Sequence, residues 1–314
     1  MHRSMTCPDD LIRPAEEIFD QAATETELAE AIAAAAADRS ALRAAAVSIL
    51  SRRMKHGRAA IAEAFAARPF DARPVTRAYC WLTDCVILTA LDLATRVMHP
   101  LHTPTESERL AVFAVGGYGR GEMAPQSDVD LLFLTPYKIT PWAESVIESM
   151  LYILWDLRLK VGHASRTIRD CLRLGAEDFT IRTALLENRF LAGDAPLAET
   201  LNQRLQDELF KGSERAFIEA KLEERDARHE KLGERYMVEP NVKEGKGGLR
   251  DLQSLFWIAK YQHRVKDVSE LMALGVFSRD EFGTFLRAET FLWAVRCHLH
   301  LIAGRPNEQL TFDM

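Results

Sequence analysis

Residues 111–134 read AVFAVGGYGRGEMAPQSDVDLLFL, and this stretch decides the fold. Together with Leu110, its first residues form a short apolar, β-branched run, which predicts a buried strand that ends at Gly116 and Gly117. Beyond the turn that follows, DVDLLFL predicts a second strand. Because successive side chains on a strand point to opposite faces, Asp128 and Asp130 project from the same face.

The residue types in this stretch indicate a chemistry. Two adjacent carboxylates repel each other and raise a pKa unless a cation lies between them. Mg²⁺ suits such a pair, because it takes one or two carboxylates and completes its octahedron with water and phosphate oxygens. The glycines let the backbone approach an anion, and Arg120 adds a fixed positive charge. We therefore expect Asp128 and Asp130 to be catalytic, metal-binding residues, with Gly116, Gly117, Arg120 and Ser127 at the nucleotide, as in a nucleotidyltransferase.

Other glycine motifs and other classes of protein fit less well. A P-loop pattern does not occur, and GYGRG lacks the spacing and following helix of a dinucleotide fingerprint. Forty basic against 46 acidic residues give a net charge of −6, which disfavours binding to a polynucleotide. Without an apolar run of about 18 residues or a signal peptide, the chain is expected in the cytoplasm and not in a membrane. Five scattered cysteines favour reduced thiols over disulfides or a zinc site.

Around the central stretch, helical patterns dominate. The Ala-rich region 26–70 and an apolar segment from Pro74 to Pro100 predict helices, as does the segment 141–155. Residues 159–165, LKVGHAS, predict a third strand. From there to the end, the pattern is nearly all helix, with capping boxes expected at Thr167 and Ser278 and a helix end at Gly304.

A second glycine-rich loop interrupts these C-terminal helices. The stretch 238–251, VEPNVKEGKGGLRD, is rich in charge and precedes a helix whose N-terminus would attract an anion. One interpretation is a second wall of the nucleotide pocket, with Lys243 or Arg250 reaching phosphate. The other is a capped turn between domains, in which Arg250 and Asp251 form salt bridges.

The sequence also carries a resemblance. VGGYGRGEMAPQSDVDLLFL resembles the signature of the DNA polymerase β-type nucleotidyltransferase superfamily. Its residues are similar to those of the bacterial PII uridylyltransferase/uridylyl-removing enzymes. Two further stretches, LWDLRLKVGHASRTIRDC and VEPNVKEGKGGLRDLQSLFWIAK, are also similar to segments of that family. The likeness runs from about Ala111 to the C-terminus.

The resemblance implies an α+β fold with a small mixed sheet flanked by helices. We expect a helical region over 1–105, the nucleotidyltransferase core over 106–175 and a helical domain over 176–314. The superfamily usually takes a third carboxylate from the next core strand, but residues 159–165 contain none. Asp156 and Glu187 are the candidates, although each also fits an ordinary helix-end or surface carboxylate.

The implied activity is Mg²⁺-dependent transfer of UMP from UTP to a tyrosine hydroxyl of the PII signal protein. The alternatives are an adenylyltransferase acting on glutamine synthetase and a non-catalytic PII-binding module. Because family members continue into an HD-type phosphohydrolase and two ACT domains, the chain is expected to be truncated before them, and regulation by glutamine is expected to need those domains.

Overall fold

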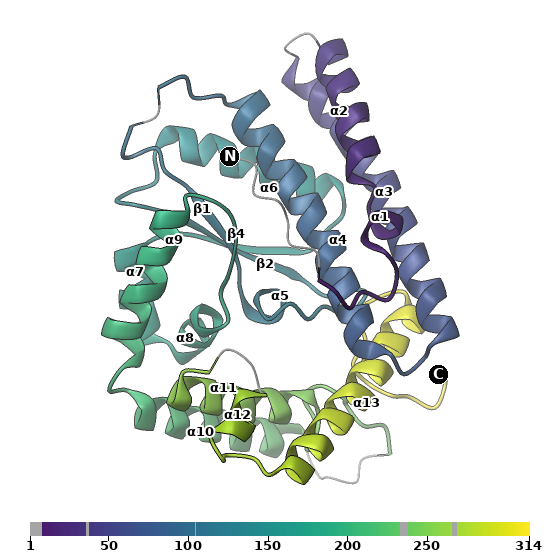
Figure 1. Ribbon diagram of the computed structural model, residues 1–314, viewed down its shortest axis with the longest axis vertical. Helices are drawn as coiled ribbons and strands as arrows, with labels where there is room; N and C mark the ends of the chain where they lie inside the picture. The colour runs from purple at the N-terminus through teal and green to yellow at the C-terminus, as the bar shows by residue number, and fades with distance from the viewer. Residues whose placement is uncertain (1–7, 36–37, 104, 233–237, 266–268) are drawn as a thin grey trace.

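The computed structural model describes residues 8–35, 38–103, 105–232, 238–265 and 269–314. In this part of the chain four strands form one mixed sheet in the order β3-β2-β1-β4 (Figure 1). The strands are β1 (Ala111–Ala114), β2 (Val129–Thr135), β3 (Val161–Thr167) and β4 (Arg189–Gly193). β1 pairs antiparallel with β2 and β4, and β2 pairs parallel with β3. The α+β fold with a small mixed sheet is therefore confirmed.

Alternating side chains bury both faces of the sheet. On one face, Val112 and Phe133 join a core with α4 (Ala72–Asp92) and α6 (Pro141–Asp156). On the other face, Phe113 and Leu132 pack with α7, α8 and α9. These three helices span Ile168–Glu177, Phe179–Leu186 and Ala195–Arg204. Both faces being covered explains why β1 and β2 read as continuous apolar runs in the sequence.

Further helices surround this core. The N-terminal layer comprises α1 (Ala15–Ile18), α2 (Gln21–Ala35) and α3 (Arg39–Ala67), and α4 continues into the π-helical η1 (Leu93–Met98). The C-terminal part comprises η2 (Leu205–Phe210), α10 (Glu214–Leu232), α11 (Leu249–His263), α12 (Glu270–Ala273) and α13 (Arg279–Ala303). Both predicted capping boxes are present, at Thr167 and Ser278, and Gly304 is left-handed with φ 62°.

One prediction about the second half of the chain is wrong. The segment beyond residue 165 was expected to be nearly all helix, but β4 lies there and forms the edge of the sheet beside β1. β4 is five residues long and only one of them, Leu191, is buried, so it lacks a clear period-2 pattern. Its place in the sheet comes from pairing with β1, which a local pattern does not reveal.

The cysteines and the most apolar helical stretch of the described chain both lie in the core. The cysteines in the described residues, Cys80, Cys85, Cys171 and Cys297, are buried and free, as expected. One helical stretch of the described chain, Ala72–Met98, is long and apolar enough to cross a membrane by length and composition. Its most apolar window is 67% buried inside the protein, so packing of α4 against the sheet and α3 accounts for its composition.

Candidate active site

The two predicted catalytic aspartates lie at the start of β2. Asp128 precedes the strand, and Asp130 is in register with Gly162 of the neighbouring β3. A Cβ atom added to Gly162 would lie 2.3 Å from Asp130 Oδ1, and one added to Gly116 would lie 3.5 Å from Oδ2. The Asp130 carboxylate therefore fills the space between the glycine turn and β3, and Gly162 leaves that space free by having no side chain.

The electrostatics of Asp130 follow from this position. Burial raises the pKa of its carboxyl group, and the negative charge of Asp128 raises it further, while Lys243 acts in the opposite direction. The paired carboxylates thus carry negative charge at a free-energy cost that a cation would relieve. In the described chain no group of three or more His, Cys, Asp or Glu residues is placed to hold a metal ion. Two hard oxygen ligands still fit Mg²⁺, whose remaining ligands are commonly water and phosphate oxygens.

The glycine turn forms a single helical turn, α5 (Gly116–Gly119), directly after β1. Gly116 has φ +60°, a left-handed conformation that favours glycine, so the chain can reverse next to Asp130. A Cβ on Gly119 would lie 1.8 Å from the carbonyl oxygen of Glu187, so the turn also packs tightly against the end of α8. The first amides of such a turn have no intrahelical partner, which suits them to meet an anion.

A partly buried polar network fixes this turn to the rest of the core. The Tyr118 hydroxyl donates to Asp84 Oδ1 at 2.6 Å, and Arg189 Nη1 donates to Asp84 Oδ2 at 2.8 Å. Arg189 Nη2 also donates to the carbonyl oxygen of Tyr118 at 3.3 Å. Burial, with the charge of Asp84, raises the pKa of Tyr118, so it stays a hydrogen-bond donor. No local pattern in the sequence indicates this network, because its members come from α4, α5 and β4.

Arg120 and Glu187 were expected in separate roles, but the structure pairs them. Arg120 Nη1 donates to Glu187 Oε2 at 2.6 Å, and its Nε donates to Glu122 Oε2 at 3.0 Å. Lys260 Nζ lies 3.5 Å from the other oxygen of Glu187. The Glu187 side chain is fully buried and that of Arg120 is 9% exposed. Within the described residues, the guanidinium predicted to meet phosphate is thus engaged by two carboxylates.

The other third-carboxylate candidate and Ser127 also have local partners. Asp156 ends α6, and its carboxylate lies 3.3 Å from Arg43 Nε of α3. Ser127 Oγ accepts a hydrogen bond from the Ala124 amide at 2.9 Å, which closes the loop before Asp128. Ser127 also lines a cavity of about 20 Å³, room for roughly one water molecule. The contacts of Asp156, Glu187 and Ser127 thus lead to other groups than the aspartate pair.

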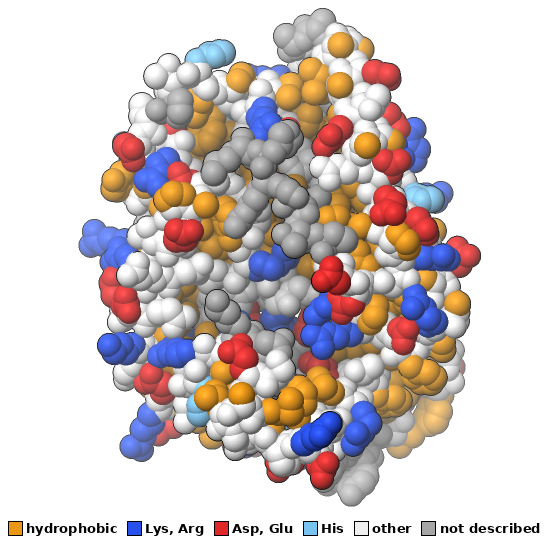
Figure 2. Space-filling view, viewed as in Figure 1, with side chains coloured by type: hydrophobic (Ala, Val, Ile, Leu, Met, Phe, Trp, Pro, Cys, Tyr) orange, Lys and Arg blue, Asp and Glu red, His pale blue; other side chains and the backbone are white. Residues whose placement is uncertain are grey.

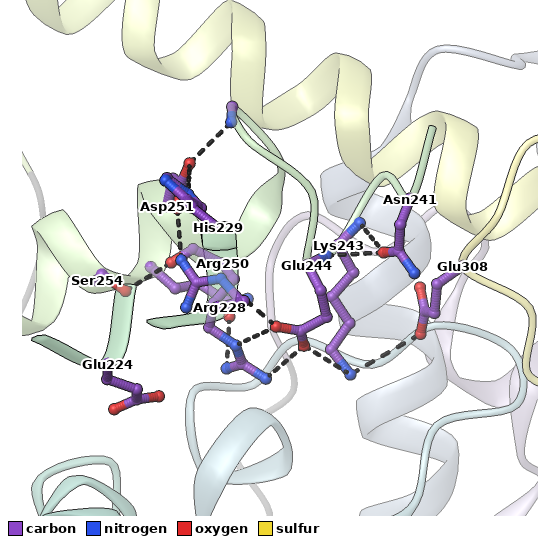
Figure 3. Close-up of polar contacts among 12 residues, drawn as sticks. Glu224, Arg228, His229, Asn241, Lys243, Glu244, Arg250, Asp251, Ser254 and Glu308 are labelled. Carbon is purple, nitrogen blue, oxygen red and sulfur yellow. Dashed lines mark hydrogen bonds and ion pairs between the residues drawn. The ribbon is translucent and has the colours of Figure 1, made fainter. Parts of the chain in front are cut away.

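Lys243 is the residue of the second glycine loop whose charge acts on Asp130 of the aspartate pair. Asn241 Oδ1 accepts hydrogen bonds from the amides of Lys243 and Glu244, at 3.0 and 2.7 Å, and so shapes the loop (Figure 3). Lys243 Nζ lies 3.8 Å from Glu244 and 3.9 Å from Glu308. Burial and the nearby charge of Arg296 lower the pKa of Lys243. The charge of Lys243 acts on Asp130, which indicates that this part of the loop lies near the start of β2.

Arg250 and Asp251 make the salt bridges expected of a capped turn. Arg250 Nη2 lies 3.1 Å from Glu244 Oε1, and Asp251 accepts from the Gly247 amide at 2.7 Å and contacts His229 (Figure 3). The amide of Leu249 donates to the Val242 carbonyl at 3.0 Å, and that of Arg250 donates to the Lys243 carbonyl at 2.8 Å. These amides at the start of α11 are therefore occupied by backbone carbonyls and do not face an anion.

The last residues of the chain hold this loop in place. The Val242 amide donates to the Glu308 carbonyl at 2.8 Å, and the Leu310 amide donates to that of Pro240 at 3.0 Å. Arg296 of α13 forms two hydrogen bonds with the Glu308 carboxylate, at 2.7 and 2.8 Å. Although burial opposes it, contacts with His300 and Arg296 lower the pKa of Glu308 to about 2. This charged contact positions the backbone that carries Lys243.

Known proteins are similar to this chain over most of its length. Residues 216–314 match the family model described as GlnD PII-uridylyltransferase, and residues 1–157 match that of glutamate-ammonia ligase adenylyltransferase. The chain is 69% identical over 297 residues to a bifunctional uridylyltransferase/uridylyl-removing enzyme of Ruegeria pomeroyi, covering 95% of this chain and 33% of the relative. It is 61% identical over 306 residues to that of Cereibacter sphaeroides, covering 97% and 33%. The chain thus spans about a third of the length of these curated relatives.

Proposed function

The chain belongs to the family of bifunctional uridylyltransferase/uridylyl-removing enzymes, and from this we propose that it transfers UMP from UTP to a tyrosine hydroxyl of the PII nitrogen-regulatory protein. The reaction would depend on Mg²⁺ and release pyrophosphate. The observation that carries the proposal is the carboxylate pair Asp128 and Asp130, which lies beside the Gly116 turn and within the field of Lys243.

Each part of the site has a defined task in this reaction. Asp128 and Asp130 would hold Mg²⁺, which supplies charge neutralisation for the phosphates and for the attacking and leaving oxygens. The amides of Gly116 and Gly117 would bind phosphate oxygens, and Lys243 would offset the negative charge of the triphosphate. The acceptor oxygen forms a bond to the α-phosphorus as the bond to pyrophosphate breaks. The tyrosine hydroxyl, with an ordinary pKa near 10, releases its proton to water as this bond forms.

The surface charge is consistent with one small anionic substrate. On the face shown in Figure 2, acidic and basic side chains are interspersed, and no continuous basic band crosses it. A long phosphate backbone would call for such a band. One triphosphate needs only a local site, and the glycine turn with Lys243 supplies it.

The proposal is tested by incubating the protein with labelled UTP, Mg²⁺ and purified PII. We expect the label on PII, and we expect Asp128→Asn to abolish the labelling. Asp207→Asn, which neutralises an exposed aspartate in η2, is the matched control and should label PII like the unmodified protein. Equal labelling by Asp128→Asn would contradict the metal-binding role of the pair.

A second activity is favoured by one observation. The adenylyltransferase model matches residues 1–157, a range that includes the glycine turn and both aspartates. The same assay with labelled ATP and glutamine synthetase distinguishes the two transferases, because transfer of AMP to that acceptor would replace the uridylyltransferase proposal. A PII-binding module without catalysis would bind UTP no better in the presence of Mg²⁺, which a direct binding measurement detects.

A further inference from the structure

The strand β3 forms an edge of the sheet immediately beside the catalytic strand β2. In a parallel pair, the residues of one strand alternate between bonding the partner and facing away. The Val129 amide donates to the Lys160 carbonyl at 2.8 Å, which sets the phase of this alternation. The backbone N–H and C=O groups of Val161, His163 and Ser165 therefore point away from β2. Such an edge is a template for pairing with another chain.

The same edge gives access to the catalytic carboxylate. Gly162 is exposed and is in register with Asp130, so both positions lie on one face of the sheet. Because Gly162 has no side chain, nothing on β3 stands between the Asp130 carboxylate and the open side of the strand. Strands lie about 4.8 Å apart, so a strand added outside β3 would lie about 10 Å from the backbone of β2. A tyrosine side chain and an aspartate side chain together span that distance.

The chemistry of the edge indicates the kind of segment that it would bind. Residues 157–169 contain Arg158, Lys160, Arg166 and Arg169, and the carboxylates that flank this stretch, Asp156 and Asp170, lie 3.3 Å from Arg43 and 3.7 Å from Arg173. On the α6 side, Trp155 is 45% exposed, and its ring centroid lies 6.2 Å from that of His163. The edge thus offers positive charge, an aromatic surface and backbone groups that pair with no other strand in the described part of the chain, which suits an extended segment with acidic residues.

We propose that the free edge of β3 is the docking site for the segment of the acceptor protein that carries the reactive hydroxyl. The inference rests on the proposed transferase function. The segment adds as an extended strand, so that backbone hydrogen bonds give affinity and alternating side chains give selectivity. Its residue in register with Gly162 faces the same side as Asp130, and its hydroxyl reaches the carboxylates across the position that lacks a side chain.

The opposite edge of the sheet does not offer the same geometry. β4 is also an edge strand, but β1 lies between it and β2. A segment added there would be separated from Asp130 by two strands instead of one. The position of β3 beside the aspartates therefore selects it as the docking edge.

The test is a proline at position 163. His163→Pro removes one outward-pointing amide but no hydrogen bond to β2, and proline is tolerated on strand edges in this orientation. We expect the KM for PII to rise about fivefold or more, because one hydrogen bond is lost and the proline ring adds a steric clash. The KM for UTP should be unchanged. His163→Ala keeps the amide and isolates the contribution of the imidazole, which the proline effect must exceed.

Hydrogen exchange on the unmodified protein gives an independent measurement. With PII added, we expect slower exchange in the peptide that contains residues 161–167 and no comparable change in the peptide that contains β4. An unchanged KM for PII in His163→Pro, or unprotected β3 amides in a protein that labels PII, would overturn the docking site and leave the transferase proposal standing. If the unmodified protein labels no acceptor, the transferase proposal fails and the docking site fails with it.

Discussion

Replacing Glu187 by glutamine tests whether this carboxylate stabilises the fold or serves the reaction as a third catalytic acid. The structure favours the first role. The Glu187 side chain is fully buried, accepts from Arg120 at 2.6 Å and lies 3.5 Å from Lys260. Its neighbours are two cations and not the aspartate pair, so its charge holds α5 and α11 against the end of α8.

The expected magnitude follows from the burial of the pair. Removing one partner of a buried ion pair costs about 3–5 kcal/mol, because the remaining charge is left without compensation. Glutamine keeps one hydrogen-bond acceptor, and Glu122 still contacts Arg120 at 3.0 Å, so we expect the lower end, about 3 kcal/mol. The matched control is Glu122→Gln. Its side chain is 28% exposed, and we expect a loss of less than about 1 kcal/mol.

The assay is urea unfolding of the two variants and the unmodified protein, followed by circular dichroism at neutral pH. Glu187→Gln should lower the midpoint without changing the slope. Combining Glu187→Leu with Arg120→Met should restore part of the stability, because the buried guanidinium is then removed together with its carboxylate, while the charges that remain, on Lys260 and Glu122, are 21% and 28% exposed to water. An unchanged midpoint together with lost transfer of UMP would refute the structural role and assign Glu187 to catalysis.

Three further predictions concern the aspartate pair and its surroundings. Asp130→Asn should raise the thermal midpoint at pH 7 without Mg²⁺, because the raised pKa means that ionised Asp130 costs stability; this gain should shrink as the pH falls through the raised pKa and be absent below about 4, where the carboxyl group is protonated in the folded and the unfolded chain. Glu308→Gln should lower the thermal midpoint at pH 7 but not near pH 2. The stability that comes from a lowered carboxyl pKa is present above about pH 4.3 and is lost as the pH falls to about 2. Equal thermal midpoints at pH 7 would count against the contact between Glu308 and Arg296. Gly162→Ala should lower kcat by at least about tenfold. The added Cβ would lie 2.3 Å from Asp130 Oδ1 and would displace a carboxylate whose position must be held within about 0.5 Å. The control Gly283→Ala, in α13, should leave kcat unchanged.

The local parts of the site were predictable from the sequence because neighbouring residues determine them. The apolar run before Gly116 predicted β1, and the pattern of DVDLLFL predicted β2, which contains Asp130 and begins directly after Asp128. Burial raises the pKa of Asp130, and the repulsion expected from Asp128 raises it further. The two capping boxes were predictable for the same reason, since each bond joins residues three apart.

What the sequence did not reveal depends on contacts between distant segments. β4 belongs to the sheet only through its pairing with β1, and its own residues carry no strong pattern. Arg120 and Glu187 each looked available for a substrate, but they lie 2.6 Å apart in the fold. The sequence does not reveal with which residue a charged side chain forms an ion pair. Patterns of charge therefore locate a site more reliably than they assign a role to each of its residues.

The carboxylates around each predicted cation also indicate which cation is best placed to bind a nucleotide. Arg120 has two carboxylates at 3.0 Å or less, and Arg250 has Glu244 at 3.1 Å, so both are neutralised by the fold itself. Among the described residues, the nearest carboxylates to Lys243 Nζ are 3.8 and 3.9 Å away, beyond hydrogen-bond distance. Burial lowers the pKa of Lys243 while its charge acts on Asp130, so an anion between them would stabilise the charged lysine. Of the three cations, Lys243 therefore has the most to gain from a triphosphate.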